Sequence, residues 1–175
     1  MQLRAYQAAG NAKILAGLHQ VQRVLGVAPT GSGKGTMAVD LLERAVHAGL
    51  RALFLVHRQE IVIDIAKRLR VRGLSTAEIY GNRPFFKDSQ VHVANIQTLI
   101  NIPELKYDFV VVDEAHHAPA DTWAYLIGSQ KNAKVVGLTA TPQRADGKPM
   151  GTVFQELHDI VSYSFLLEHG YIVPT

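Results

Sequence analysis

Short apolar runs recur along the chain and are separated by amphipathic stretches. These runs are residues 21–27, Leu53–Val56, Val91–Ala94, Phe109–Val112 and Val135–Leu138. A continuous apolar run of this length is typical of a strand that is covered on both faces, as in a parallel sheet. The pattern therefore predicts a buried strand at each run.

Between the runs, apolar residues return at helical spacing. The two clearest sets are Ala38, Leu41, Leu42 and Ala45, and then Ile61, Ile65, Ala66 and Leu69. Each set lines one face of a predicted helix, and the helices are expected to stop near Gly49 and before Gly73. The basic residues of 67–72 are interpreted as the solvated face of the second helix. Alternating strands and helices predict an α/β fold with a doubly wound, mostly parallel sheet.

Composition sets limits on these predictions. The chain has 175 residues and is 47% hydrophobic, which is enough for a real core, so we expect one domain over residues 1–175. A net charge of +3 permits a polyanionic partner without requiring one. The absence of cysteine excludes disulfides and thiolate metal sites. No apolar run has the length of a membrane span, and the first residues lack a secretory signal, so a cytoplasmic protein without membrane association is expected.

A glycine-rich segment follows the first predicted strand. It reads Ala28-Pro29-Thr30-Gly31-Ser32-Gly33-Lys34-Gly35-Thr36. Glycines allow successive backbone N–H groups to turn toward an anion, and the helix that follows contributes its unpaired N-terminal N–H groups. Lys34 stands where an ammonium group can reach the β- and γ-phosphates of a nucleotide. The segment is therefore expected to be a P-loop, with residues 29–36 holding the phosphates.

The P-loop departs from the strict pattern at both ends. Ala28 replaces the first glycine, and Gly35 replaces the Ser or Thr whose hydroxyl normally contacts Mg²⁺. Thr36 follows at once and is a candidate metal ligand, directly or through water. The segment Gly-Ser-Gly-Lys-Gly-Thr also resembles the loop of nucleoside monophosphate kinases, which keeps ATP binding compatible with the departure.

A pair of acidic residues ends a later apolar run, in Val110-Val111-Val112-Asp113-Glu114-Ala115-His116. Asp113 can hold Mg²⁺ through water, and Glu114 can orient and deprotonate an attacking water. Ligands of open α/β sheets bind at the carboxyl ends of strands. Because Lys34, Asp113 and Glu114 all follow predicted strands, we expect them to form one catalytic site for ATP with Mg²⁺.

Taken with the P-loop, these motifs resemble a known family. Asp113-Glu114-Ala115-His116 is similar to the signature of the DExH-box superfamily 2 helicases and translocases. Leu3-Arg4-Ala5-Tyr6-Gln7 resembles the N-terminal element whose glutamine contacts adenine. The resemblance implies that Gln7 reads the adenine and that Arg4 belongs to the same nucleotide site.

Further motifs of the family follow in order. Residues 55–60 resemble motif Ia and residues 94–99 the segment after it, which implies that His57, Arg58, Gln97 and Thr98 contact the nucleic-acid backbone. Residues 138–142 resemble motif III, which implies that His116, Thr139 and Thr141 couple the nucleotide site to the nucleic-acid track. Residues 143–147 continue this motif in the style of the DNA repair, restriction and phage enzymes of the superfamily. Residues 170–174 resemble the end of a first motor domain.

The resemblance implies a RecA-like P-loop NTPase domain that uses ATP to move on DNA, with RNA possible. It also implies a second RecA-like domain, which supplies an arginine finger and without which hydrolysis is slow. Two other functions stay open: a small-molecule kinase, and a nucleotide-gated module that binds nucleic acid without hydrolysis.

Several of these residues also have ordinary structural interpretations. Gln7 alone could be a surface helix residue, and Gln97 and Thr98 could cap a helix that begins near Asn95. Phe85 and Phe86, which stand beside basic residues, are expected to pin a loop to the core rather than to stack on bases.

Overall fold

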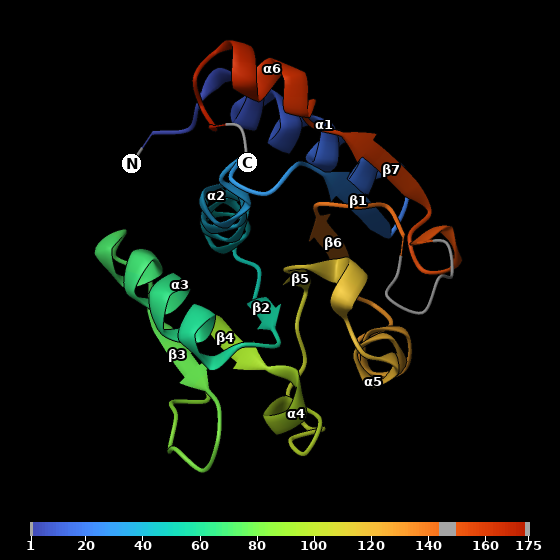
Figure 1. Ribbon diagram of the computed structural model, residues 1–175. Coiled ribbons are helices and arrows are strands. Elements are labelled where there is room, and N and C mark those ends of the chain that lie inside the picture. Colours follow the sequence, from blue (N-terminus) through green and yellow to red (C-terminus); the bar gives the residue numbers. More distant parts are fainter. Residues whose placement is uncertain (1, 144–149, 174–175) are drawn as a thin grey trace.

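The computed structural model describes residues 2–143 and 150–173. Its sheet has seven strands, all parallel, in the order β3-β4-β2-β5-β6-β1-β7 (Figure 1). The strands are β1 (Arg23–Val27), β2 (Ala52–Val56), β3 (Thr76–Ile79), β4 (Val91–Asn95), β5 (Phe109–Val112), β6 (Lys134–Thr139) and β7 (Glu156–Asp159). Every predicted strand is confirmed, whereas β3 and β7, the two edge strands, were not predicted.

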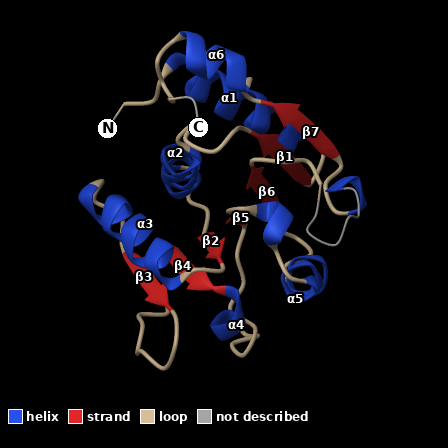
Figure 2. Ribbon diagram, in the orientation of Figure 1, coloured by secondary structure: helices blue, strands red, loops and turns tan. Residues whose placement is uncertain are grey.

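Helices cover both faces of the sheet, as Figure 2 shows. They are α1 (Ala5–Gln20), α2 (Lys34–His47), α3 (Gln59–Val71), α4 (Ile96–Leu99), α5 (Ala120–Ala124) and α6 (Tyr163–Glu168), with the short turns η1 (Ala115–His117), η2 (Tyr125–Ser129) and η3 (Met150–Thr152). One apolar core joins α1, α2 and α3 to the sheet, and a second joins α4 and α5 to the opposite face. The doubly wound α/β arrangement is therefore confirmed.

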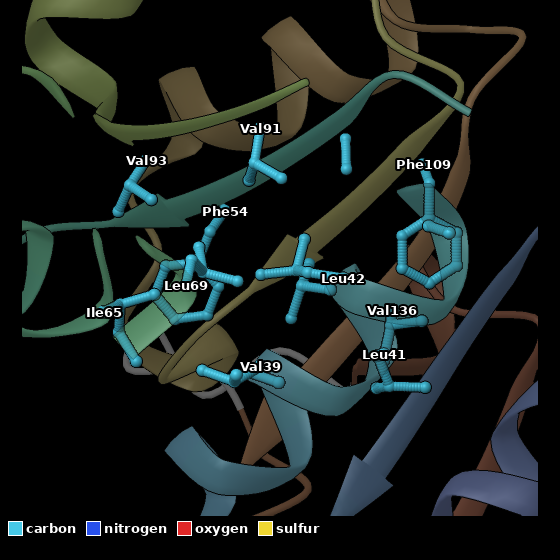
Figure 3. Close-up of a cluster of buried hydrophobic side chains, with 14 of the residues drawn as sticks. Val39, Leu41, Leu42, Phe54, Ile65, Leu69, Val91, Val93, Phe109 and Val136 are labelled. Atoms are coloured by element: carbon cyan, nitrogen blue, oxygen red, sulfur yellow. The ribbon is translucent and has the colours of Figure 1, made fainter. Parts of the chain in front are cut away.

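The larger core packs helix side chains directly onto strand side chains (Figure 3). Leu42 of α2 and Leu69 of α3 are fully buried, as is Phe54 of β2 beneath them. Burying one such side chain stabilises the fold by about 1.5–3 kcal/mol. This layer holds α2 and α3 against the sheet, and both helices begin at the end of the sheet that carries the predicted site.

The predicted helix ends are also confirmed. Gly49 and Gly73 follow α2 and α3 with φ of +79° and +81°, the left-handed conformation that glycine adopts without strain. The cap of α4 differs from the expectation, because the Asn95 side chain accepts the Gln97 N–H at 2.9 Å. The idea that Gln97 or Thr98 caps this helix is therefore wrong.

Of the two phenylalanines that were expected to pin the loop between β3 and β4 to the core, only Phe85 does so. Phe85 packs against the core, where its ring meets the ring of the buried His92 edge-on. Phe86 is 66% exposed, so it does not pin the loop. Among the described residues no helix is both long enough and apolar enough to cross a membrane.

Candidate nucleotide and nucleic-acid site

The site lies at the carboxyl ends of β1, β6 and β5, which are neighbours in the sheet. The P-loop follows β1, Thr139 ends β6, and Asp113 follows β5. Ala28 N–H donates to Thr139 O and joins the P-loop to β6, β5 pairs with β6 up to Val112 and Gly137, and Asp113 N–H donates to Leu55 O of β2 on the other side. The sheet thus brings together residues that lie far apart in the sequence, such as Lys34 and Glu114.

The P-loop requires glycine at two of its positions. Gly31 and Gly33 both have φ of +83°, where a side chain is strained. A Cβ atom on Gly33 would also overlap the amide nitrogen of Gln7. Gly33 ends the loop, and its carbonyl accepts the N–H groups of Thr36 and Met37 in the first turn of α2. The loop therefore has the glycine-dependent backbone turns expected of a P-loop.

Lys34 is the first residue of α2 and is only 7% exposed. Its Nζ donates to the carbonyl oxygen of Ala28 at 3.2 Å and lies 3.8 Å from Oε1 of Glu114. The ammonium group is therefore held inside the loop by loop carbonyls, within reach of the acidic pair. The predicted catalytic residues Lys34, Asp113 and Glu114 do converge on one place.

Asp113 is largely buried at the end of β5. Burial, followed by the nearby charge of Glu114, raises the pKa of Asp113 to about 6. A cation beside this carboxylate would oppose that rise and favour the ionised form.

Glu114 adopts φ 47° and ψ 48°, the only left-handed non-glycine backbone among the described residues. Such a conformation costs about 1–3 kcal/mol, and it occurs mainly at functional sites. It turns the chain sharply after β5, so that the Glu114 carboxylate faces Lys34 on one side and Nδ1 of His116 at 3.4 Å on the other.

His116 and Thr139 form a direct link between the acidic motif and motif III. His116 Nδ1 and Thr139 Oγ1 are 2.6 Å apart, and the Thr139 hydroxyl, fully buried, donates to Thr141 O at 2.7 Å. Since that hydroxyl hydrogen is used, His116 Nδ1 is the donor in the first bond. Burial and the neighbouring His117 lower the pKa of His116, which keeps the ring neutral near pH 7. The three residues predicted to couple the sites are in contact.

Gln7 is buried in α1 rather than on its surface, so the surface interpretation is wrong. Its Oε1 accepts the Arg4 N–H at 2.9 Å, and its Nε2 donates to the carbonyl of Ser32 at 2.9 Å. The same carbonyl accepts the Tyr6 hydroxyl at 2.6 Å. The start of α1 therefore holds the P-loop directly, and Gln7 has one N–H hydrogen and one oxygen lone pair left for a ligand.

A cleft of about 490 Å³ opens beside the acidic pair. Its lining includes Thr30, His57, Arg58, Asp113, Glu114, His116 and His117. Nε2 of His57 is buried without a hydrogen-bond partner, and burial followed by the charge of His117 lowers the pKa of His57. His57 and Arg58 thus share a cleft with Asp113 and Glu114, as a nucleic-acid track next to the predicted nucleotide site would require.

Gln97 and Thr98 lie apart from this cleft, on α4 after β4. Gln97 is exposed, while Thr98 Oγ1 accepts the N–H of Gly81 at 3.1 Å and fastens the end of β3. Asn95 connects the two regions, because its Nδ2 donates to His57 O at 3.0 Å. Gln97 is therefore the freer of the two side chains for a ligand.

The donor set suits Mg²⁺ bound mainly by water and phosphate. No group of three or more His, Asp or Glu side chains in residues 2–143 and 150–173 could enclose a metal. Mg²⁺ is usually held by one or two carboxylates plus substrate phosphates, and Asp113 meets that need. Thr36 faces a groove between α2 and α3 with Asp64 and Arg68, whereas Asp113 lines the cleft with Thr30. The structure does not place Thr36 and Asp113 in one cleft.

A second cleft, of about 670 Å³, lies on the other side of the P-loop. Pro29, Thr30 and Gly31 form one wall, and Tyr163, Tyr171 and Ile172 form the opposite wall. This opposite wall was not predicted, because no short motif relates α6 to the P-loop. Residues 144–147 of the motif III continuation and Pro174 lie outside the described residues.

This combination of a parallel sheet, a P-loop and an acidic motif linked to motif III defines a RecA-like motor domain of the superfamily 2 helicase class. The comparison with protein families agrees. Residues 1–144 match the family described as "Type III restriction enzyme, res subunit", and the chain belongs to that family. The kinase alternative is not favoured.

A relative of similar sequence belongs to the same class, and solved structures share the fold. A Schizosaccharomyces pombe protein named as a candidate mitochondrial ATP-dependent helicase, irc3, is 28% identical over 90% of this chain and 29% of its own length. The UvsW helicase of bacteriophage T4 has a TM-score of 0.72 at 19% identity, over 91% of this chain and 60% of that one. The Type ISP restriction-modification enzyme LlaGI, solved with a DNA substrate mimic, also has a TM-score of 0.72, at 15% identity over 98% of this chain and 21% of that one.

The chain spans at most 30% of the length of the curated relatives it matches.

Proposed function

We propose that residues 1–175 are one domain, the ATP-binding first motor domain of an ATP-dependent DNA helicase or translocase. The observation that carries the proposal is the convergence of Lys34 and Glu114, 3.8 Å apart, at the mouth of a P-loop built on left-handed glycines. Lys34 binds phosphate and Glu114 orients and deprotonates water, and hydrolysis of a nucleoside triphosphate needs both.

In this proposal the loop N–H groups and Lys34 bind the β- and γ-phosphates. Asp113 would hold Mg²⁺ together with the phosphates, and the ion would supply positive charge that stabilises the phosphoryl group during transfer. Glu114 orients the attacking water and accepts its proton. Gln7 and Arg4 bind the adenosine end, since Gln7 is tied to Ser32 beside the loop. Thr36, the other metal ligand expected from the sequence, lines a different groove from Asp113, so it is not part of this proposed metal site.

The nucleic acid is proposed to be DNA, with RNA as the alternative. His57 and Arg58 supply the contacts nearest to Asp113, through the cleft that they share. Gln97 and Thr98 extend the track along the ends of β4 and α4. The DNA-bound LlaGI supports this choice because it has the same fold. The link from Glu114 through His116 to Thr139 and Thr141 supports coupling of ATP to DNA.

A second RecA-like domain is proposed to complete the site in the full-length protein, which we place in the cytoplasm. That domain would contribute an arginine finger, whose loss lowers the rate by about 10³–10⁵-fold. The 175-residue chain should accordingly bind MgATP but hydrolyse it slowly. Robust DNA-stimulated turnover by this chain alone would contradict the requirement for a second domain.

The decisive experiment compares Glu114→Gln with wild type in the full-length protein. Removing the general base should lower the hydrolysis rate by about 10²–10⁴-fold while MgATP binding is kept. Labelled ATP with nucleotide acceptors present should give inorganic phosphate rather than a phosphorylated acceptor. Unchanged hydrolysis in the variant would show that Glu114 is no base, and would favour a module that binds without hydrolysis.

A further inference from the structure

An aromatic cluster joins the start of α1 to the segment around α6. The Tyr171 ring lies 5.6 Å from the ring of Tyr6 and 6.5 Å from that of Phe165, and it stacks on His169 at 6.0 Å. The Arg4 guanidinium lies over the Tyr171 ring, with Cζ 4.3 Å from the ring centroid. Figure 1 shows α6 beside α1, although the two helices stand near opposite ends of the sequence.

The cluster touches the P-loop at two separate points. The Tyr6 hydroxyl donates to Ser32 O at 2.6 Å. Ile172, the residue after Tyr171, stands so close to Gly31 that a Cβ on this glycine would lie 3.0 Å from Ile172 Cγ2. The segment 170–173 is therefore part of the wall of the nucleotide site and not only a cover for α1.

Arg4 presents a flat cation at the edge of this site. One face of the guanidinium rests on Tyr171, and the residue as a whole is exposed, which leaves the other face accessible. The Arg4 N–H donates to Gln7, the predicted adenine reader, so the two residues are positioned as one unit. Guanidinium planes stack on nucleobases as well as on phenol rings.

We infer that Tyr171 is a positioning residue for nucleotide binding, which holds the Arg4 guanidinium flat so that it can stack on the nucleobase. The inference rests on the proposed ATP site and adds to it the residue that controls base recognition. Without the ring, Arg4 gains rotational freedom, and its flat face is no longer presented beside Gln7. The triphosphate contacts of the loop do not depend on Arg4.

Because Arg4 is proposed to contact the base and the loop to contact the phosphates, the role of Tyr171 can be measured by comparing two ligands. If Tyr171 acts through Arg4, its loss weakens binding of ATP and leaves binding of inorganic triphosphate unchanged. If Tyr171 only anchors α6 and the loop wall, both ligands weaken together. The ratio of the two dissociation constants therefore separates positioning from anchoring.

The test measures magnesium-dependent binding of ATP and of inorganic triphosphate to the 175-residue chain, for example by calorimetry. Tyr171→Ala should weaken ATP binding by about threefold to tenfold, the strength of one cation–π contact, without changing triphosphate binding. Tyr171→Phe keeps the ring and should match wild type. Phe165→Leu is the matched control, because it loosens the α6 anchor without removing the ring beneath Arg4.

Arg4→Lys provides an independent check if Tyr171→Ala fails to fold. Lysine keeps the charge but has no flat face, so the same selective loss of ATP binding is expected. Equal losses for ATP and triphosphate, or no loss in either variant, would overturn the inference while leaving the proposed function intact. Wild-type protein that binds neither ligand would overturn both.

Discussion

Replacing Gly33 by alanine measures how firmly α1 holds the P-loop. Gly33 has φ +83°, and a Cβ at this position would overlap the Gln7 amide nitrogen, which donates to Ser32 O at 2.9 Å. Gln7 is 4% exposed, so its displaced amide could not easily find water as a new partner. The substitution therefore combines backbone strain with the loss of a buried hydrogen bond.

The two contributions can be estimated separately. The left-handed backbone costs alanine about 1–2 kcal/mol. A buried donor left without its acceptor costs about 1–3 kcal/mol more. We expect Gly33→Ala to lower the free energy of unfolding by about 2–5 kcal/mol, measured by urea denaturation.

Gly73→Ala is the matched control. Gly73 has φ +81°, and a Cβ atom added to it would meet nothing within 4 Å beyond its chain neighbours, so only the backbone strain applies. Its expected cost is about 1–2 kcal/mol, and the gain in unfolded-state entropy from alanine cancels between the two variants. In a Gln7→Ala background, the cost of Gly33→Ala should fall to that of Gly73→Ala. Equal costs for the two glycines in the wild-type background would refute the reasoning.

Further predictions concern buried polar groups. Burial lowers the pKa of His92 to about 4, so its neutral form favours the fold; the stability this gives is complete above the ordinary pKa and is lost as the pH falls toward 4. Urea midpoints should show a loss of about 3 kcal/mol between pH 7 and pH 4 that His92→Gln lacks, and parallel pH profiles would contradict this. For Asp113, whose pKa is raised to about 6, stability depends on pH in the opposite direction. The neutral carboxyl favours the fold, and this advantage is lost as the pH rises through 6. Asp113→Asn should therefore stabilise the protein at pH 7 by about 1–3 kcal/mol, with no gain below pH 4; destabilisation at pH 7 would argue against a buried carboxylate. Thr139→Val should cost about 2 kcal/mol in thermal or urea unfolding, because it removes the partner of His116, whereas Thr139→Ser should keep most of that stability; equal stability of the two variants would mean that the link contributes nothing.

Apolar runs were sufficient to predict the interior strands because such strands are buried on both faces. The edge strands were not predicted, because they are less buried and lack such continuous apolar runs. β3 and β7 alternate between more and less buried positions, and β7 contains Glu156, His158 and Asp159. Their sequences carry too few apolar residues to stand out, and only pairing with β4 and β1 reveals them as strands.

The candidate site likewise has features that the sequence predicted and features that it did not. Positions 29–36 and Asp113 were predictable because motif spacing specifies a backbone shape and a strand end. The left-handed turn at Glu114 was not, since it depends on how η1 packs after β5 rather than on any residue preference. The contact of Arg4 with Tyr171 was equally hidden, because it joins segments at opposite ends of the chain.

Lys34 is a poor mutational probe of catalysis. Its ammonium group donates to the carbonyls of Ala28 and Pro29, at 3.2 and 3.5 Å, and so stabilises the conformation of the loop. The ammonium group has three N–H hydrogens, so under the proposed function an arriving phosphate either takes the third hydrogen or displaces one of these carbonyls. Truncating Lys34 would deform the loop and would also remove the proposed phosphate contact. Loss of ATP binding in Lys34→Ala would therefore say less about catalysis than the Glu114→Gln variant does.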